Sequence, residues 1–87
     1  MEVRMKSILA ENIARFRRSK GYTQEELAGK LNLSAQAVSK WENAQSLPDI
    51  TQLPRLAGLL ETDIDTLMGY IPGKKQITLY EERYQTE

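Results

Sequence analysis

The sequence of 87 residues contains no cysteine and no histidine. Without cysteine, disulfides and thiolate metal sites are excluded, which fits a reducing compartment. Without histidine, the chain lacks the commonest metal ligand and the usual general base. The acidic pairs Glu25 with Glu26 and Asp63 with Asp65 have no base, nucleophile or metal-ligand companion. We therefore expect neither an enzyme nor a bound metal or cofactor.

Long apolar runs are also absent from the sequence. No segment approaches the length of a membrane span, and the N-terminus lacks the apolar core of a signal peptide. The length is sufficient for one small domain. We expect a cytoplasmic protein that makes no contact with a membrane.

The net charge is zero, from 12 basic and 12 acidic residues, which argues mildly against a nucleic-acid partner. The charges are unevenly distributed, however. Residues 1–20 carry six basic and two acidic residues, a net charge of +4, whereas residues 61–87 carry three basic and six acidic residues, a net charge of −3. The basic end could face phosphates while the acidic end stays away from them, and both could equally be ordinary solvated surfaces.

The spacing of apolar residues predicts an all-α fold with five helices. The expected helices cover residues 6–20, 24–31, 35–43, 49–60 and a short segment that opens at 62 or 63 and ends at Gly69. Thr23 and Glu26 form a capping box for the second helix, and Ser34 caps the third. We assign residues 1–69 to one domain and residues 70–87 to a C-terminal tail. The tail pattern fits either a strand or a short helix.

Pro54 complicates the fourth helix. If Asp49 is the N-cap, Pro54 lies past the first turn and removes a backbone hydrogen bond. If Thr51 is the N-cap, Pro54 falls within the first turn, where its missing N–H has no consequence. We expect a distorted or late start to this helix.

Residues 24–43 have the pattern of two short helices joined by a tight turn, which is typical of a helix-turn-helix. Three motifs make the similarity specific, namely TQEELA from Thr23, SKWEN from Ser39 and LPDI from Leu47. With these motifs at these spacings, the chain resembles the lambda-repressor-like (Xre/Cro) family over roughly residues 8–69. Two positions depart from the family pattern, because Asn32 and Ala44 stand where glycine is common. The departure at Ala44 weakens the expectation of a tight helix end there.

The resemblance implies a sequence-specific regulator of transcription that binds double-stranded DNA, of bacterial or phage type and acting as a repressor or a dual regulator. It places base contacts at Ala35, Gln36 and Lys40, near the start of the helix over residues 35–43. The chemistry agrees for two of them, because Gln can bond an adenine edge and Lys can donate to guanine, whereas Ala can offer only its methyl group to a thymine methyl. The alternative is that these are ordinary residues on an exposed helix face.

The same resemblance assigns one residue to a phosphate, and the positions of four other polar residues on the expected helices make them candidates too. Gln24 is the family's phosphate ligand, and Ser34, Asn43, Arg15 and Arg18 are further phosphate candidates. For both arginines, plain solvation is the alternative.

The resemblance also predicts an ion pair. It pairs an arginine of the first helix with the glutamate before Asn43, which here are Arg17 and Glu42, and a guanidinium fork suits such a carboxylate. Trp41 is expected to pack between helices rather than to stack on a base.

Two further expectations concern partners. One short recognition helix covers few base pairs, so we expect a homodimer on a palindromic operator. Its interface is expected among apolar residues of the last helix and the tail, with Leu67 more suited to the core: Ile64, Met68, Ile77, Leu79, Tyr80 and Tyr84. A competing function is a protein-interaction module, such as an antitoxin or regulator partner, that binds another protein through the tail or the last helix.

Overall fold

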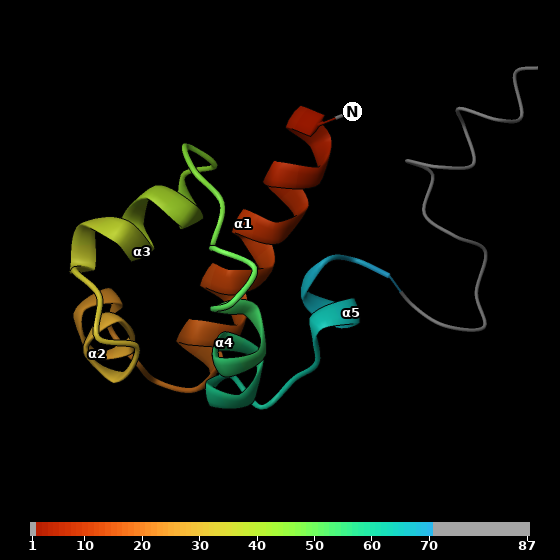
Figure 1. The fold of residues 1–87 in the computed structure, drawn as a ribbon. Coiled ribbons are helices and arrows are strands. Elements are labelled where there is room, and N and C mark those ends of the chain that lie inside the picture. The colour runs from red at the N-terminus through yellow and green to blue at the C-terminus, as the bar shows by residue number, and fades with distance from the viewer. Residues whose placement is uncertain (1, 71–87) are drawn as a thin grey trace, which may run out of the picture.

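The computed structural model describes residues 2–70, and side chains from residue 7 onward. Those residues form an all-helical unit, and the predicted all-α fold with five helices is confirmed (Figure 1). The helices are α1 (Glu2–Ser19), α2 (Gln24–Lys30), α3 (Ala35–Glu42), α4 (Leu53–Leu59) and α5 (Ile64–Leu67). The first helix is longer than predicted, because it begins at Glu2 rather than near residue 6.

Side-chain caps fix where three of the helices begin. Thr23 and Glu26 form the predicted capping box, in which each side chain bonds the backbone N–H of the other residue at 2.9 Å. The Ser34 hydroxyl accepts from the Ala37 N–H at 3.2 Å. At α5, the Asp63 carboxylate accepts from the Thr66 N–H at 2.7 Å. Hydrogen bonds from Thr66 lower the pKa of the Asp63 carboxyl below its ordinary value of 3.8. The bond to the Thr66 side chain has the larger effect, and the bond to its backbone N–H the smaller one.

The fourth helix starts late, as the position of Pro54 indicated. The N-cap is Gln52, without a side-chain cap, and Pro54 lies in the first turn of α4. A start at Asp49 is therefore wrong, and so is a cap at Thr51. Instead, the Thr51 hydroxyl donates to the Asp49 carboxylate at 3.3 Å within the preceding loop. The late start avoids the backbone hydrogen bond that Pro54 cannot make.

Left-handed backbone follows three of the helices at non-glycine residues, and one of these is Glu61 after α4, with φ of 56°. Asn32 after α2 has φ of 60°, and Ala44 after α3 has φ of 61°. The turn at Asn32 is as expected, since Asn tolerates this conformation better than most residues. At Ala44 the sequence predicted a less tight helix end. That prediction is wrong, because α3 ends tightly there despite the methyl group of Ala44. The Gln45 N–H reaches back to the Lys40 carbonyl at 2.8 Å and closes that end.

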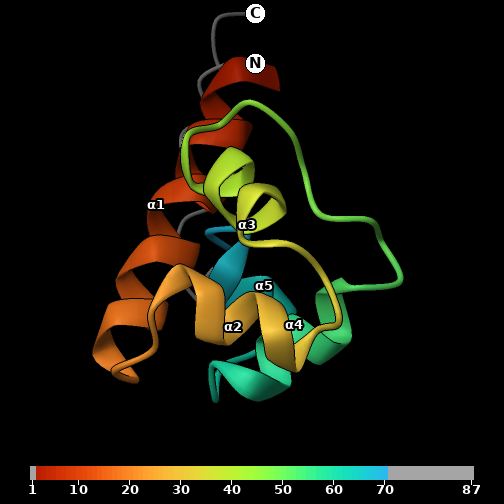
Figure 2. The same cartoon turned by 90° about the vertical axis from the view of Figure 1, so that its left-hand side faces the viewer.

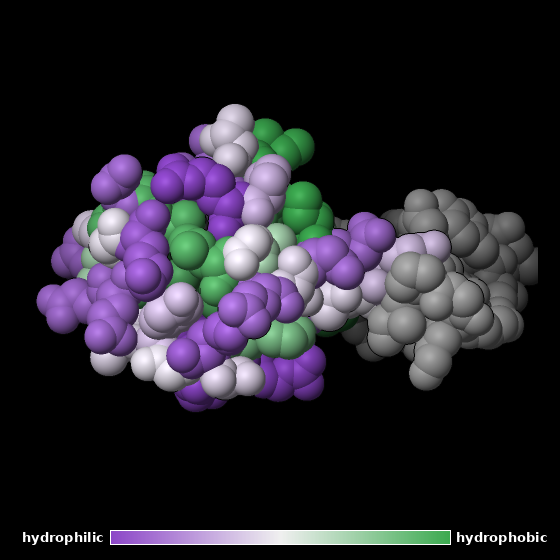
Figure 3. Space-filling model, turned by 90° about the horizontal axis from the view of Figure 1, so that it is seen from below, coloured by the Kyte–Doolittle hydropathy of each residue, from purple (hydrophilic) through white to green (hydrophobic). Residues whose placement is uncertain are grey.

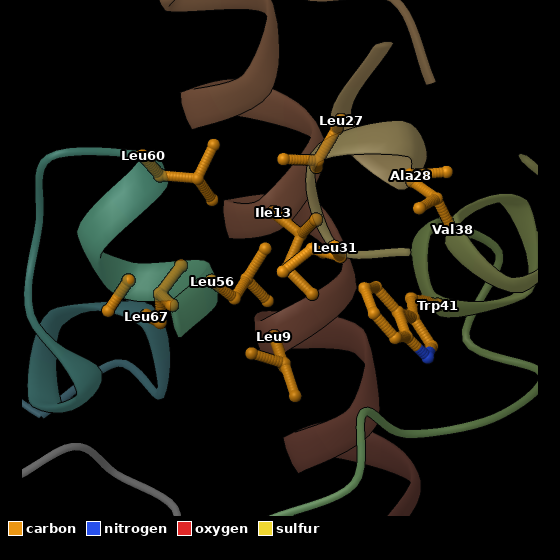
Figure 4. Close-up of a cluster of buried hydrophobic side chains, with 11 residues drawn as sticks. Leu9, Ile13, Leu27, Ala28, Leu31, Val38, Trp41, Leu56, Leu60 and Leu67 are labelled. Atoms are coloured by element: carbon orange, nitrogen blue, oxygen red, sulfur yellow. The ribbon is translucent and has the colours of Figure 1, made fainter. Parts of the chain in front are cut away.

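The hydrophobic core lies between the helices and draws on all five of them (Figure 4). Ile13 of α1 is fully buried and lies near the middle of the cluster. Leu33, in the turn between α2 and α3, packs against the core from its edge. The buried members of the cluster are Leu9, Ile13, Leu27, Ala28, Leu31, Val38, Trp41, Leu56, Ala57, Leu60 and Leu67.

The short α5 is fastened to α1. Asn12 Nδ2 donates to the carbonyl oxygen of Leu67 at 2.9 Å and to that of Thr66 at 3.3 Å. Gly69 ends this helix with φ of 89°, and a Cβ atom there would lie 2.8 Å from Ile8 Cγ2. Glycine at this position therefore satisfies both the turn and the close approach to α1.

Polar side chains dominate the outer surface in the view from below, with apolar ones visible between them (Figure 3). Among the residues described, Leu47, Ile50 and Tyr70 are large apolar residues that remain exposed. In the same part of the chain, no helix combines the length and apolar character needed to cross a membrane.

Candidate nucleic-acid interface

The pair α2 and α3 forms one side of the molecule, away from α5 (Figures 1 and 2). The two helices pack together through core residues, and α3 also contacts α1. On the inner face of α3, Val38 is fully buried and Trp41 is 6% exposed. Trp41 therefore packs between helices, and its ring is not available as an open stacking surface.

The opposite face of α3 points to solvent. Gln36 and Lys40 are exposed and lie one helical turn apart, and Asn43 follows at the next turn. Ala35 at the start of the helix is half-buried. The structure therefore brings Gln36, Lys40 and Asn43 together on one outward stripe, next to Ala35. An exposed polar stripe on a helix held from behind by the core is the geometry needed to enter a DNA groove.

A partly buried hydrogen-bond network supports this helix pair from behind. Arg17 Nε donates to Glu42 Oε2 at 2.7 Å, and Arg17 Nη2 donates to Glu42 Oε1 at 3.0 Å. The two side chains are 11% and 6% exposed. Arg17 Nη1 also donates to the carbonyl oxygen of Tyr22 at 2.9 Å. One guanidinium thus links α1 to the end of α3 and to the connection before α2.

The pKa of Arg17 is raised above its usual value. The largest cause is the hydrogen bond to Glu42, and the charge of Glu42 acts in the same direction. Desolvation opposes both effects. The arginine is therefore charged throughout the working range of a protein, and it neutralises the buried carboxylate.

Gln24 joins the same network, which the sequence did not reveal. Its Nε2 donates to Glu42 Oε1 at 2.9 Å, across 18 positions of sequence. No local spacing rule connects the first residue of one helix to the last residue of the next, so this contact required the fold. One of the two amide hydrogens of Gln24 is used in this way, and the other remains for a ligand.

The remaining phosphate candidates occupy different settings. Ser34 uses its hydroxyl oxygen as the cap of α3, which leaves the hydroxyl hydrogen free to donate. Asn43 is exposed and makes a long 3.4 Å contact from Nδ2 to Ser39 Oγ. Arg15 and Arg18 are exposed on α1, and the guanidinium of Arg15 lies 5.2 Å from the ring centre of Phe16.

Two acidic residues lie in the first turn of α2, at the edge of the candidate interface. Glu26 belongs to the capping box. Glu25 is exposed in the first turn of α2, so the charge there opposes a phosphate. This local repulsion favours the side chain of Gln24, rather than the helix end itself, as the candidate phosphate ligand at α2.

The expected dimer residues fall into two groups. Ile64 and Met68 are partly buried and pack against the core, and Leu67 is fully buried in it. The other candidates lie outside the described residues, namely Ile77, Leu79, Tyr80 and Tyr84.

Comparison with known proteins agrees with this geometry. A family model described as "Helix-turn-helix" matches residues 13–67. The HTH-type transcriptional activator BcrR of Enterococcus faecalis is 35% identical over 71 residues, which cover 82% of this chain and 33% of BcrR. The phage CTXphi transcriptional repressor RstR of Vibrio cholerae is 31% identical over 61 residues, which cover 70% of this chain and 54% of RstR. The chain therefore spans about a third of the first relative and about half of the second.

A solved structure gives the same picture. The hypothetical transcription factor NHTF from Neisseria superposes with a TM-score of 0.70 at 26% identity, covering 100% of this chain and 90% of that chain. The two relatives carry opposite regulatory names, since BcrR is named an activator and RstR a repressor.

Proposed function

Because the chain belongs to the helix-turn-helix family, we propose that it is a sequence-specific transcriptional regulator that binds double-stranded DNA and places α3 in the major groove. The observation that carries the proposal is the two-sided character of α3. Val38 and Trp41 fix one face in the core, while Gln36 and Lys40 project from the other. The relatives named as transcriptional regulators support the same function. We assign the chain no enzymatic reaction.

Gln36 and Lys40 are proposed to read bases. Gln36 offers an adjacent donor and acceptor that match an adenine edge, and Lys40 donates to O6 and N7 of guanine. Ala35 at the groove-entering end contributes only a methyl contact, which suits thymine. These three positions would supply specificity.

Gln24, Ser34, Asn43, Arg15 and Arg18 are proposed to contact phosphates. The first three retain at least one free donor hydrogen each, and the two arginines are exposed and charged. Such contacts fix the register on DNA and supply affinity without sequence information.

We further propose a homodimer on a palindromic operator, with repression by obstruction of a promoter in the cytoplasm of a bacterium. Ile64 and Met68 are the candidate interface residues within the described part of the chain. A protein partner bound through the C-terminal tail stays a prediction, because residues 71–87 lie outside the described part of the chain.

Selection of bound duplexes from a random DNA pool tests the proposal, followed by a comparison of variants on the selected operator and its single-base changes. Gln36→Ala should lose about 1–3 kcal/mol of discrimination at one base pair. Gln24→Ala should weaken every duplex by a similar factor, because a phosphate contact carries no sequence information. Glu61→Gln is the control and should leave binding unchanged, because Glu61 is exposed after α4, outside both the candidate DNA interface and the proposed dimer residues. If Gln36→Ala keeps the wild-type ratios on all operator variants, α3 does not read DNA in this way.

A further inference from the structure

Glu42 connects three helices through one carboxylate. It lies at the end of α3, and its Oε1 accepts both from Arg17 Nη2 at 3.0 Å and from Gln24 Nε2 at 2.9 Å. Its Oε2 accepts from Arg17 Nε at 2.7 Å. The start of α2 and the end of α3 both lie beside α1 in Figure 2, where this junction forms. Glu42 is therefore the link between the arginine behind the interface and the glutamine at its edge.

The chemistry of this link determines how Gln24 is oriented. A carboxylate only accepts hydrogen bonds, so the side-chain amide of Gln24 must turn its nitrogen toward Glu42. The reversed amide would set its oxygen against the carboxylate oxygen. The bond to an ionised acceptor is also stronger than one between neutral groups. The second N–H and the oxygen of Gln24 are thereby held in fixed directions before any ligand arrives.

We propose that Glu42 is a positioning residue for DNA binding, which acts by holding the Gln24 amide ready for a phosphate. This inference rests on the proposed function. A long polar side chain that is free in solution loses rotamer freedom when it binds, and a side chain already held loses less. The buried negative charge does not repel the DNA strongly, because Arg17 neutralises it at 2.7 Å.

Replacing both members of the ion pair distinguishes the role of Glu42 in holding Gln24 from its role in the stability of the fold. Exchanging Arg17→Met together with Glu42→Met leaves the net charge unchanged and fills the site with apolar side chains, and such exchanges are often neutral for stability. Gln24 then loses its acceptor while the helices remain in place. The experiment measures affinity for the selected operator in four proteins: wild type, the pair replacement, Gln24→Ala, and all three changes together. Circular dichroism confirms that each is folded at the temperature used.

The pair replacement should weaken binding several-fold, up to about tenfold, in the presence of Gln24. It should have little effect when Gln24 is already alanine. In the free protein, the side-chain amide of Gln24 should exchange its hydrogens more slowly in wild type than in the pair replacement, as followed by NMR. Equal losses of affinity in both backgrounds, or none in either, would overturn the positioning role while the DNA-binding function stands. Failure of the wild-type protein to select any duplex would overturn both.

Discussion

At the scale of single residues, Arg17 and Glu42 are the two charges that the fold can least do without. Each is about nine-tenths removed from solvent, and each satisfies the other through two short hydrogen bonds. An ion pair removed from solvent in this way adds little to the free energy of unfolding compared with two apolar side chains in the same place. The loss of one partner, however, leaves the other charge unpaired. The contribution of the ion pair to stability therefore becomes apparent mainly when one of its two partners is removed.

We expect Arg17→Ala to destabilise the fold by about 3–5 kcal/mol, because Glu42 would keep only the neutral donor of Gln24. Arg18→Ala is the matched control, since Arg18 is the adjacent exposed arginine of α1. That change should stay within about 0.5 kcal/mol of wild type. Urea denaturation followed by circular dichroism measures both. Equal midpoints for the two variants would mean that the pair is not an important part of the fold.

Some contacts of this site could be predicted from the sequence and others could not. The pairing of Arg17 with Glu42 could be proposed from family resemblance, because both residues match positions of the family pattern. The bond from Gln24 to Glu42 could not, since it depends on how α2 and α3 cross rather than on local spacing. Base contacts at Gln36 and Lys40 stay predictions, because exposure on α3 is necessary for them but not sufficient.

At the scale of helices and turns, the end of α3 is the most instructive element. Ala44 takes φ of 61°, a conformation that disfavours residues with a Cβ atom. The turn forms nevertheless, because Trp41 and the loop that follows are held by the core and by backbone hydrogen bonds to Lys40. Tertiary structure here overrides a local preference.

The strain at Ala44 predicts opposite outcomes for the same chemical change at two positions. Ala44→Gly should stabilise the protein by about 0.5–1 kcal/mol, because glycine adopts positive φ without a steric penalty. Ala37→Gly lies inside α3 and should destabilise it by about 1 kcal/mol. Thermal denaturation of the two variants provides the measurement. A loss of stability for Ala44→Gly comparable to that of Ala37→Gly would show that the turn is not strained.

The helices themselves were predictable where capping residues coincide with apolar periodicity. That holds at α2 and α3, where Thr23 and Ser34 cap the helices as expected. It holds less well at α4, where Asp49 resembles a cap but bonds to Thr51 in the loop instead. Pro54 indicated the late start, whereas Gln52, which makes no side-chain cap, gave no local signal.

At the scale of the whole molecule, one protomer offers one short recognition helix. The outward face of α3 presents two polar side chains suited to base edges, Gln36 and Lys40. A mismatch at one base pair typically costs about 1–3 kcal/mol, so two or three contacts cannot single out one site among a genome of competitors. Two protomers bound side by side would double the number of contacts. The need for a second protomer follows from the number of base contacts and does not depend on which residues form the interface.

We therefore expect two protomers per operator, with recognition helices about one DNA turn, or roughly 34 Å, apart on the same face of the duplex. Sedimentation of the saturated complex on the selected palindrome should give a ratio of two protomers to one duplex. Inserting about five base pairs between the half-sites turns one of them to the opposite face, so cooperative binding should disappear while each half-site still binds weakly. This change alters only the DNA, so it cannot disturb the partly buried Ile64 and Met68 and thereby the fold. Saturation of the intact palindrome by a single protomer would show that the protein works as a monomer.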